Sequence, residues 1–537
     1  MKLVTVTQMQ AIEKAADAGG LTYDQMMENA GQGLADLVLE MFLDEPEPEA
    51  VGLVGAGNNG GDTLVALTAL VEEGWKAKAY LVKRKKDDLV TRFTEAGGEL
   101  ITGKDAFDGL AESIEVADVV LDGVLGTGIK LPLKKDAGEL LEEVNVILES
   151  LDEAPLVIAV DCPSGVDCDS GDVAEQAIPA DLTVTMAAVK QGLLKLPAFE
   201  YVGALEVVDI GQSDDLKSWK EVKTDVAEAD SVAMLLPERP PASHKGTFGT
   251  AILAAGSLAY TGAALLAGEA AYRSGAGLVT LAVPAPVHGA LAGQLPEATW
   301  ILLPHEKGGI ASSAAEILAK HLDKADALLI GPGFGMEDGT KEFIANLLNG
   351  KSSAKKSAGI GFVHGDETKK DLSDAKLPPM IVDADGLRLL AKIDDWHKKL
   401  PELSVLTPHP GEMSALTGLS TEEIQVDRQA MARKYAKEWG HVVVLKGAFT
   451  VVASPDGHMT VIPVASPALA RAGTGDVLAG LITGLRAQGM DAYDAAIAGA
   501  WIHAQAGLYS ADDLGSTASV LAGDVLNSIP DVMSELE

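Results

Sequence analysis

Short apolar runs alternate with amphipathic helical patterns along most of this chain. The runs that predict strands lie at 51–54, 78–82, 116–121, 156–160, 182–186 and 205–208, and then at 250–255, 278–283, 327–330, 380–383, 404–407, 442–446 and 450–453. Two helices are expected before the first strand, one with Thr7 as its cap and apolar positions from Met9 to Ala16, the other at 23–42. Such alternation predicts βαβ units, largely parallel sheets and an α/β protein of three-layer αβα architecture.

The alternation stops between residues 211 and 242, where polar and proline-rich sequence replaces it. The chain has 537 residues, whereas a single hydrophobic core stops growing at about 250–300 residues. We therefore expect two domains, at residues 1–215 and 225–537. A stretch rich in lysine, serine and glycine at 349–370 is expected to be an insertion or surface loop.

Charge and cysteine content limit the classes of partner and compartment. The formal net charge of −37 argues against nucleic-acid binding, because no basic patch would easily dominate such a field. Only Cys162 and Cys168 are present, which is no disulfide framework and indicates a reducing compartment. We expect a cytoplasmic protein, since the first residues lack the apolar stretch of a signal peptide. Apolar helices near the N-terminus favour a homo-oligomer.

One stretch, residues 247–268, carries no charge and is long enough to raise the question of a membrane span. Glycine, serine and threonine residues divide it, with a turn signal at Gly256 and Ser257. We expect a buried strand, a loop and a helix there, and no membrane association.

Three polar, glycine-rich loops follow strands of the first half. Residues 55–62 satisfy the G-x-G-x-x-G pattern of dinucleotide folds, although a tight strand-to-helix turn explains these glycines equally well. Asp122 and Asp161 open the loops at 122–128 and 161–167, and each singly reads as a helix cap. Because the carboxyl ends of parallel strands meet at one edge, the oxygens of these loops together suit a hard cation. The basic run at 83–86 favours a 2′-phosphate over a free ribose hydroxyl.

The sharpest motif of the second half is the glycine-rich segment at 472–480, which contains Asp476. Its glycines leave backbone N–H groups free to form an anion hole at a helix start, where Asp476 could accept a proton. The alternative is a glycine-rich turn in which Asp476 only caps the helix. Similar loops follow other strands, at 331–335, 407–412 and 446–448, and a further one precedes the first strand at 244–249.

The loops of the first half, together with the segment from Met26 to Gly31, resemble the signatures of NAD(P)H-hydrate epimerases over residues 1–211. The resemblance implies a Rossmann-like domain that interconverts the R and S forms of the hydrated cofactor at C6 of its nicotinamide ring. It implies that Asp161 transfers the proton and binds the ring, and that Lys190 assists it. The alternative is that Lys190 is an ordinary surface lysine. The resemblance also implies that K⁺ is held by Asn59, Asp122 and Ser164. It places the hydrate on Asn58, Asn59, Gly60, Gly61, Asp62, Gly126, Thr127, Gly128, Ile129, Lys130, Leu131 and Pro132. Thr63 departs from the family, which commonly has glycine there.

The loops of the second half resemble the ADP- or ATP-dependent NAD(P)H-hydrate dehydratases, which share the ribokinase-like fold, over residues 225–537. The resemblance implies that Asp476 is the catalytic base and that Mg²⁺ accompanies ADP or ATP, with ADP favoured. The hydrate is expected on Ala263, Gly333, His409 and Asp476. The nucleotide is expected on Lys446, Gly447, Ala448, Phe449, Thr450, Ser466, Arg471, Ala472, Gly473, Thr474 and Gly475.

Two alternatives remain open at this point. The Gly-Thr-Gly-Asp motif does not by itself distinguish a dehydratase from a vitamin-phosphorylating kinase of the same fold. The first domain is alternatively a non-catalytic module that binds a nucleotide or partner. The fusion of both halves favours a repair enzyme, because together they clear both epimers of the hydrate.

Overall fold

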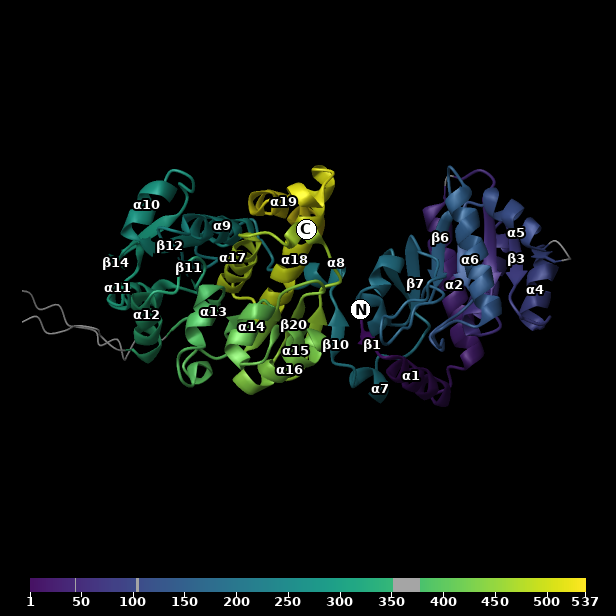
Figure 1. The fold of residues 1–537 in the computed structure, drawn as a ribbon, viewed down its shortest axis with the longest axis horizontal. Helices are drawn as coiled ribbons and strands as arrows, with labels where there is room; N and C mark the ends of the chain where they lie inside the picture. Colours follow the sequence, from purple (N-terminus) through teal and green to yellow (C-terminus); the bar gives the residue numbers. More distant parts are fainter. Residues whose placement is uncertain (44, 103–105, 351–376) are drawn as a thin grey trace, which may run out of the picture. The chain divides into compact units, whose positions relative to one another are not determined.

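The computed structural model describes residues 1–43, 45–102, 106–350 and 377–537. They form two compact units, Met1–Val226 and Ala227–Glu537 (Figure 1). Residues 216–224, which the sequence pattern left between the domains, therefore belong to the first unit, where α7 (Lys217–Lys220) and β10 (Thr224–Val226) form. The surface loop expected at 349–370 lies outside the described residues from position 351 onward.

A parallel sheet of seven strands forms the centre of the first unit. Its strands are β2 (Glu49–Val54), β3 (Lys76–Leu81), β4 (Glu99–Ile101), β5 (Val119–Gly123), β6 (Leu156–Val160), β7 (Leu182–Met186) and β9 (Ala204–Val208). Their order, β4-β3-β2-β5-β6-β7-β9, is the 3-2-1-4-5-6 order of doubly wound dinucleotide-binding folds with one strand added. The six strands predicted in this half are confirmed, whereas the short edge strand β4 was not predicted.

Helices cover both faces of this sheet, as the apolar pattern predicted. One core packs against α1 (Val6–Ala18), α2 (Tyr23–Met41), α3 (Asn58–Glu72) and α4 (Asp88–Ala96). The opposite core packs against α5 (Ala106–Glu115) and α6 (Lys135–Ser150). Side chains of β2 alternate between the two, with Val54 in the first core and Leu53 in the second, so the strand is buried on both sides.

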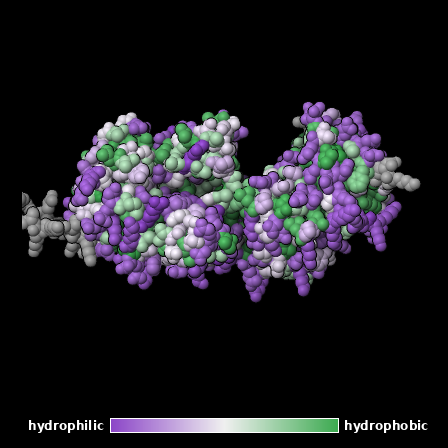
Figure 2. Space-filling view, viewed as in Figure 1, coloured by the Kyte–Doolittle hydropathy of each residue, from purple (hydrophilic) through white to green (hydrophobic). Residues whose placement is uncertain are grey.

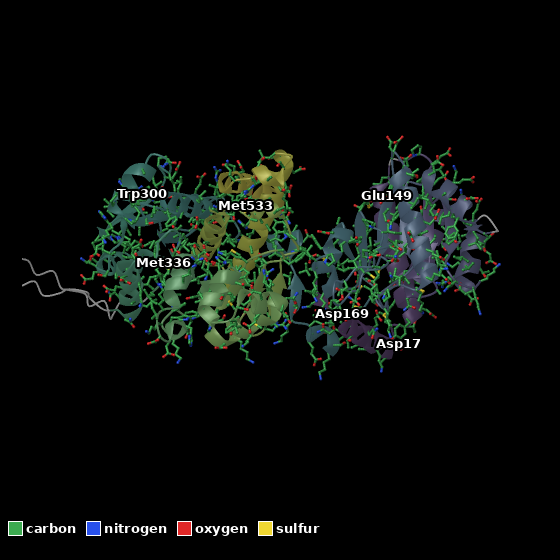
Figure 3. The ribbon with its side chains drawn as sticks, viewed as in Figure 1. Asp17, Glu149, Asp169, Trp300, Met336 and Met533 are labelled. Atoms are coloured by element: carbon green, nitrogen blue, oxygen red, sulfur yellow. The ribbon has the colours of Figure 1, made fainter. Side chains whose placement is uncertain are left out.

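Hydrogen bonds and a short strand pairing fix the start of helix α1. Its N-cap is Thr5 and not the predicted Thr7, because Thr5 and Gln8 form a reciprocal capping box at 3.1 and 2.8 Å. The Val6 amide also donates to Asp169 Oδ1 at 2.9 Å. Before the helix, β1 (Leu3–Val4) pairs in parallel with β8 (Val189–Lys190). Figure 3 labels Asp169 beside α1 and Asp17 near its far end.

The second unit has its own doubly wound sheet, in the order β21-β20-β19-β18-β17-β16-β11-β12-β13. Its strands are β11 (Thr250–Ala254), β12 (Leu278–Pro284), β13 (Thr299–Leu303), β16 (Ala327–Ile330), β17 (Met380–Val382), β18 (Val405–Leu406), β19 (Val442–Leu445), β20 (Val451–Ala453) and β21 (Met459–Val461). Across the sheet, neighbouring strands pair in parallel from β13 through β12, β11, β16, β17 and β18 to β19. The pairs β19–β20 and β20–β21 are antiparallel. A separate hairpin joins β14 (His305–Glu306) to β15 (Gly309–Ile310).

Two helical layers enclose this sheet. One contains α8 (Ala229–Ala233), α9 (Thr261–Arg273), α10 (Ala285–Leu291), α17 (Thr474–Ala487), α18 (Ala492–Asp513) and α19 (Ala522–Leu536). The other contains α11 (Ala314–Ala319), α12 (Asp338–Asn349), α13 (Asp385–Leu390), α14 (Pro410–Thr417), α15 (Thr421–Val426) and α16 (Arg428–Trp439). The three-layer prediction is therefore confirmed for both units.

The uncharged stretch at 247–268 forms β11, a loop and most of α9, as expected. Its apolar side faces α17, which approaches so closely that a Cβ at Gly480 would lie 2.2 Å from the carbonyl oxygen of Ala267. Within the described part of the chain, no helix combines the length and apolar character that a membrane crossing requires. The face shown in Figure 2 is mostly hydrophilic, with apolar side chains scattered over it.

Candidate active sites

The first glycine-rich loop of the first unit turns tightly between β2 and α3. A Cβ at Gly60 would lie 2.0 Å from the carbonyl oxygen of Gly55, so only glycine permits this turn. The Arg84 guanidinium donates to the carbonyl oxygens of Gly55 and Gly57 at 3.1 and 3.2 Å. Arg84, which belongs to the basic run at 83–86, therefore holds the backbone of this loop in place.

The three residues predicted to hold a cation lie together at the carboxyl edge of the sheet. Ser164 donates from its hydroxyl and its amide to the two oxygens of Asp122, at 2.6 and 2.8 Å. Asn59 donates its amide to the carbonyl oxygens of Val160 and Leu125, at 2.5 and 3.4 Å. Its own Oδ1 faces Gly126, where a Cβ would lie only 2.2 Å away.

Asp122 is 1% exposed, and burial raises the pKa of its carboxyl, while the hydrogen bonds from Ser164 and Val124 oppose that rise. The described residues contain no group of three or more His, Cys, Asp or Glu side chains that could hold a metal ion. The set that was predicted to hold a cation combines the carboxylate of Asp122 with neutral amide and hydroxyl oxygens of Asn59 and Ser164. A buried carboxylate that is hydrogen-bonded only by neutral groups is stabilised by such an ion.

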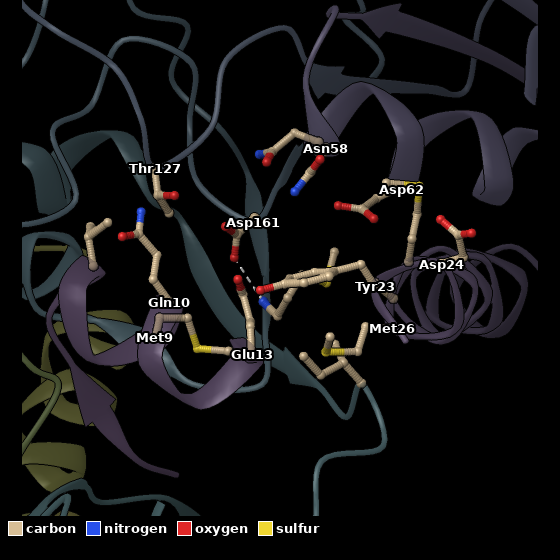
Figure 4. A pocket seen from close by; sticks show the side chains of 16 residues that line it. Met9, Gln10, Glu13, Tyr23, Asp24, Met26, Asn58, Asp62, Thr127 and Asp161 are labelled. Carbon is tan, nitrogen blue, oxygen red and sulfur yellow. Dashed lines mark hydrogen bonds between the residues drawn. The ribbon is translucent and has the colours of Figure 1, made fainter. Parts of the chain in front are cut away.

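A pocket of about 300 Å³ opens beside this set (Figure 4). Helices α1 and α2, the start of α3 and the strand ends line it. It contains five predicted residues, namely Asn58, Asn59, Asp62, Thr127 and Asp161. Of the predicted segment from Gly126 to Pro132, Thr127 alone lines the pocket, and Gly128, Lys130 and Pro132 are exposed.

Asp161 directly follows β6 and has a left-handed backbone (φ 67°), a conformation that is strained for residues other than glycine and tends to occur at functional sites. Its Oδ1 accepts from Thr185 Oγ1 at 3.1 Å, from the Met186 amide at 3.0 Å and from Lys190 Nζ. Lys190 is 1% exposed and also donates to Thr185 Oγ1 and the Met186 carbonyl, at 3.0 and 2.9 Å. The surface-lysine alternative for Lys190 is therefore wrong.

Sequence reasoning missed Glu13 and Tyr23, which also line the pocket. Burial and the charge of Asp161 raise the pKa of Glu13, and Lys190 opposes that rise. Burial and Asp161 raise the pKa of Asp62 well above its ordinary value. The sequence contains a signal for Glu13, because it follows Met9 by four residues. At helical spacing, Glu13 therefore lies on the apolar face of α1.

Thr63, where the resembling family commonly has glycine, is fully buried and donates to the carbonyl oxygen of Asn59 at 2.7 Å. A Cβ at Gly123 would lie 1.9 Å from its hydroxyl. The absence of a side chain at Gly123, in β5, therefore leaves the space that the Thr63 side chain fills.

In the second unit, Asp476 lies in the first turn of α17, whose N-cap is Gly473 with φ 93°. The capping role considered for Asp476 is therefore taken by Gly473. Thr474 Oγ1 fixes the turn by donating to the carbonyl oxygens of Leu469 and Arg471, each at 2.9 Å. A Cβ at Gly475 would lie 3.4 Å from Lys446 Nζ and 3.9 Å from Asp383 Oδ2, so the motif faces these two residues.

An ion-pair network surrounds this turn. Lys446 Nζ lies 2.6 Å from Asp383 Oδ1 and 3.7 Å from Glu412 Oε2, and Asp383 also accepts from Thr407 Oγ1 at 2.7 Å. Burial, followed by the charge of Asp383, raises the pKa of Asp476 to about 7, and Lys446 opposes that rise. A carboxyl that titrates near neutral pH suits proton transfer. The sequence assigned no role to Asp383, the last residue of the predicted strand at 380–383, or to Glu412, in the loop at 407–412.

The remaining predicted residues of this half fall into four places. Gly333 and Ala263 are neighbours, since a Cβ at Gly333 would lie 2.8 Å from that of Ala263. His409 caps α14, accepting at Nδ1 from the Gly411 amide at 3.0 Å, with Nε2 at 3.2 Å from Glu412. The loop from Gly447 to Thr450 is held by Arg428, which donates to the Ala448 carbonyl. Ser466 caps a short 3-10 helix, and Arg471 donates to the Ala518 carbonyl.

Both halves of this chain are similar to known proteins. A family described as YjeF-related protein N-terminus matches residues 23–192, and a family described as NAD(P)H-hydrate dehydratase matches residues 251–356 and 359–531. A bifunctional NAD(P)H-hydrate repair enzyme from Moorella thermoacetica is 35% identical over 100% of this chain and 97% of its own length. The chain belongs to the family of bifunctional NAD(P)H-hydrate repair enzymes.

Other members of this repair-enzyme family are similarly related over nearly their whole length. The Thermofilum pendens enzyme is 32% identical over 100% of this chain and 97% of its own length. The Escherichia coli enzyme is 31% identical over 97% of this chain and 92% of its own. A solved ADP/ATP-dependent NAD(P)H-hydrate dehydratase from Bacillus subtilis, co-crystallised with ATP and Mg²⁺, is 32% identical with a TM-score of 0.47. It covers 58% of this chain and 99% of its own.

Proposed function

We propose that this chain repairs hydrated nicotinamide cofactors in two steps. The first unit interconverts R- and S-NAD(P)HX, and the second dehydrates S-NAD(P)HX to NAD(P)H at the expense of ADP or ATP. The observation that carries the proposal is the full-length match to bifunctional repair enzymes in a chain that keeps a buried acid–base group in each half. The family match at 251–531 favours dehydration over vitamin phosphorylation.

In the first unit, Asp161 is the proton-transfer group at the hydrated ring, and Lys190 holds its carboxylate in place. Asn58, Asp62 and Thr127 contact the hydrate in the same pocket, and the glycines at 60, 61, 126 and 128 belong to the loops whose backbone N–H groups bind its phosphates. Asn59, Asp122 and Ser164 hold K⁺, which offsets negative charge beside those phosphates when it is bound.

In the second unit, Asp476 takes the proton from the ring hydroxyl as that oxygen accepts the terminal phosphoryl group. Elimination of phosphate then restores the dihydronicotinamide. Residues 472–475 present backbone N–H groups to the nucleotide phosphates, and Lys446 adds a buried positive charge beside them. Bound Mg²⁺ would neutralise those phosphates, with Asp383 as its carboxylate, since Asp383 Oδ2 faces the turn at Gly475. ADP is the favoured phosphoryl donor.

The compartment and assembly belong to the same proposal. Two free, buried cysteines, Cys162 and Cys168, are in keeping with a reducing cytoplasm. Exposed Tyr23 and Met41 on α2, 46% and 50% accessible, offer apolar surface to a second copy of the chain.

The direct test mixes both NADHX epimers with the full chain, Mg²⁺ and either ADP or ATP, and follows NADH absorbance at 340 nm. We expect complete conversion of both epimers with one of the nucleotides, because epimerisation supplies the S form continuously. Recovery of only half the hydrate would contradict the epimerase role. Failure with both nucleotides, accompanied by phosphorylation of a vitamin substrate, would contradict the dehydratase role.

The cation site makes a separate prediction. We expect Asp122→Asn to raise the K⁺ concentration that gives half-maximal epimerisation by about 10–100-fold, because it removes the only charge among the three proposed ligands. The rate of epimer interconversion is measured by chromatography while KCl replaces tetramethylammonium chloride at constant ionic strength. Asp118→Asn is not a suitable control, since Asp118 accepts from the Glu49 amide at 2.8 Å. The exposed Asp136→Asn is suitable, and an unchanged K⁺ requirement in Asp122→Asn would refute the site.

A further inference from the structure

Glu13 is a carboxyl group of the epimerase pocket for which the mechanism above has no use. It comes from α1, whereas Asp161 comes from the end of β6, and both side chains line the same pocket of about 300 Å³. In Figure 4 both carboxyl groups point into the hollow. Glu13 is half-buried, so a ring entering this pocket meets carboxyl groups from two separate elements.

The fold places Glu13 beside the Asp161–Lys190 pair. The parallel pairing of β1 with β8 sets Val4 opposite Lys190, and α1 begins two residues later. Met9, Ile12 and Ala16 bury the same face of α1 that carries Glu13. The position of Glu13 is therefore set by backbone pairing and core packing, unlike that of a flexible surface glutamate.

The proposed chemistry requires two groups of opposite protonation. Inverting C6 through loss and return of water needs a proton donor for the departing hydroxyl and a proton acceptor for the incoming water. Asp161 forms an ion pair with the Lys190 ammonium, so we assign it the role of acceptor. Asp161 alone therefore leaves the departing hydroxyl without a donor.

On the basis of the proposed epimerase function, we propose that Glu13 is a second catalytic acid–base residue, working with Asp161 across the hydrated ring. Glu13 gives its proton to the C6 hydroxyl, the C6–O bond breaks, water leaves, and the N1 lone pair forms an N1=C6 double bond. A water molecule then bonds to C6 from the opposite face, loses a proton to Asp161, and the π electrons return to N1. One water leaves and one enters. In the reverse direction the two carboxyl groups exchange roles, and solvent resets their protons.

Electrostatics agree with this division of labour. Burial and the nearby charge of Asp161 raise the pKa of Glu13, which keeps it protonated to higher pH than an ordinary glutamate. Asp62 also lines the pocket with a raised pKa, but it lies near the N-terminus of α3, where we place the phosphates of the hydrate.

The experiment compares the full chain with Glu13→Gln, which keeps the size of the side chain and removes its proton. Asp17→Asn is the matched control, because Asp17 lies one turn along α1 and is exposed (Figure 3). Epimer interconversion of NADHX is followed by chromatography in H₂¹⁸O, with oxygen incorporation read by mass spectrometry. Dehydration of purified S-NADHX by the second unit of the same chain reports the amount of folded protein.

We expect Glu13→Gln to lower kcat for epimerisation about 10²–10⁴-fold with little change in KM, and Asp17→Asn to match the unmodified chain. Each turnover of the unmodified chain should introduce one solvent oxygen at C6. Epimerisation with retained oxygen would overturn the proposal, because it indicates ring opening at N1–C6. A Glu13→Gln rate within threefold of the unmodified chain would also overturn it. The proposal would likewise fail if Asp62→Asn, and not Glu13→Gln, lost epimerisation. Absence of epimerisation in the unmodified chain would instead reject the proposed function itself.

Discussion

The Asp476→Asn variant is expected to lose NADH recovery from S-NADHX by about 10²–10⁴-fold while keeping epimerisation unchanged. The amide has the size of the carboxyl but accepts no proton at neutral pH, so the ring hydroxyl stays protonated and attacks the phosphoryl group poorly. The glycine turn itself is retained, since Gly473 and Thr474 fix it through backbone conformation and hydrogen bonds. The measurement is absorbance at 340 nm from purified S-NADHX, beside epimer interconversion in the same preparation.

The exposed Asp513→Asn, at the end of α18, is the matched control for this loss of charge. Loss of both activities in Asp476→Asn would point to a folding defect and would not support a catalytic role. Retention of NADH recovery within a few-fold would remove Asp476 from the chemistry.

The pH profile of the unmodified chain gives independent evidence on the same residue. A base must be deprotonated, and burial with the charge of Asp383 raises the pKa of Asp476 to about 7. We therefore expect kcat/KM for dehydration, which reports groups of the free enzyme, to fall tenfold per pH unit below about pH 7 and to level off above it. A profile that stays flat down to pH 5 would contradict this assignment.

Lys190→Met is expected to destabilise the first unit by about 3–5 kcal/mol and to abolish epimerisation. The substitution keeps the length of the side chain but leaves the carboxylate of Asp161 without its buried cation, which is the costly way to break such a pair. Hydrogen-exchange mass spectrometry in increasing urea gives the stability of the first unit, and dehydration of S-NADHX shows that the second unit is still folded.

The double variant Lys190→Met/Asp161→Asn distinguishes pairing from a general packing defect. With both charges removed, we expect most of the lost stability to return while epimerisation stays absent, which gives a large coupling energy in the double-mutant cycle. Additive losses of stability would mean that Lys190 contributes packing alone.

The apolar pattern predicted the fold well because strands buried on both faces read as continuous apolar runs. Among the strands named above for the central sheet of each unit, it missed β4, β13 and β21, which are short or lie toward the margins of their sheets. It also chose Thr7 as the cap of α1, although Thr5 and Gln8 have the spacing of a capping box. That signal was present in the sequence, whereas the end of the first unit at Val226 depends on contacts that no local pattern contains.

The motif loops predicted which side chains gather at one edge of each sheet, because loops after parallel strands must meet there. They did not predict which charges pair across long separations. Lys190 follows Asp161 by 29 residues and Lys446 follows Asp383 by 63, and neither pairing has a local sequence signal. The left-handed backbone of Asp161 is likewise set by its surroundings, since an isolated aspartate rarely adopts it.

The two compact units each have their own sheet, cores and candidate site, yet they share one chain. Translation therefore produces one epimerase site for every dehydratase site, whatever the level of expression. A cell that encodes them together needs no separate control to keep the two activities in proportion. The capacity to repair the R form then rises and falls in step with the capacity to consume the S form.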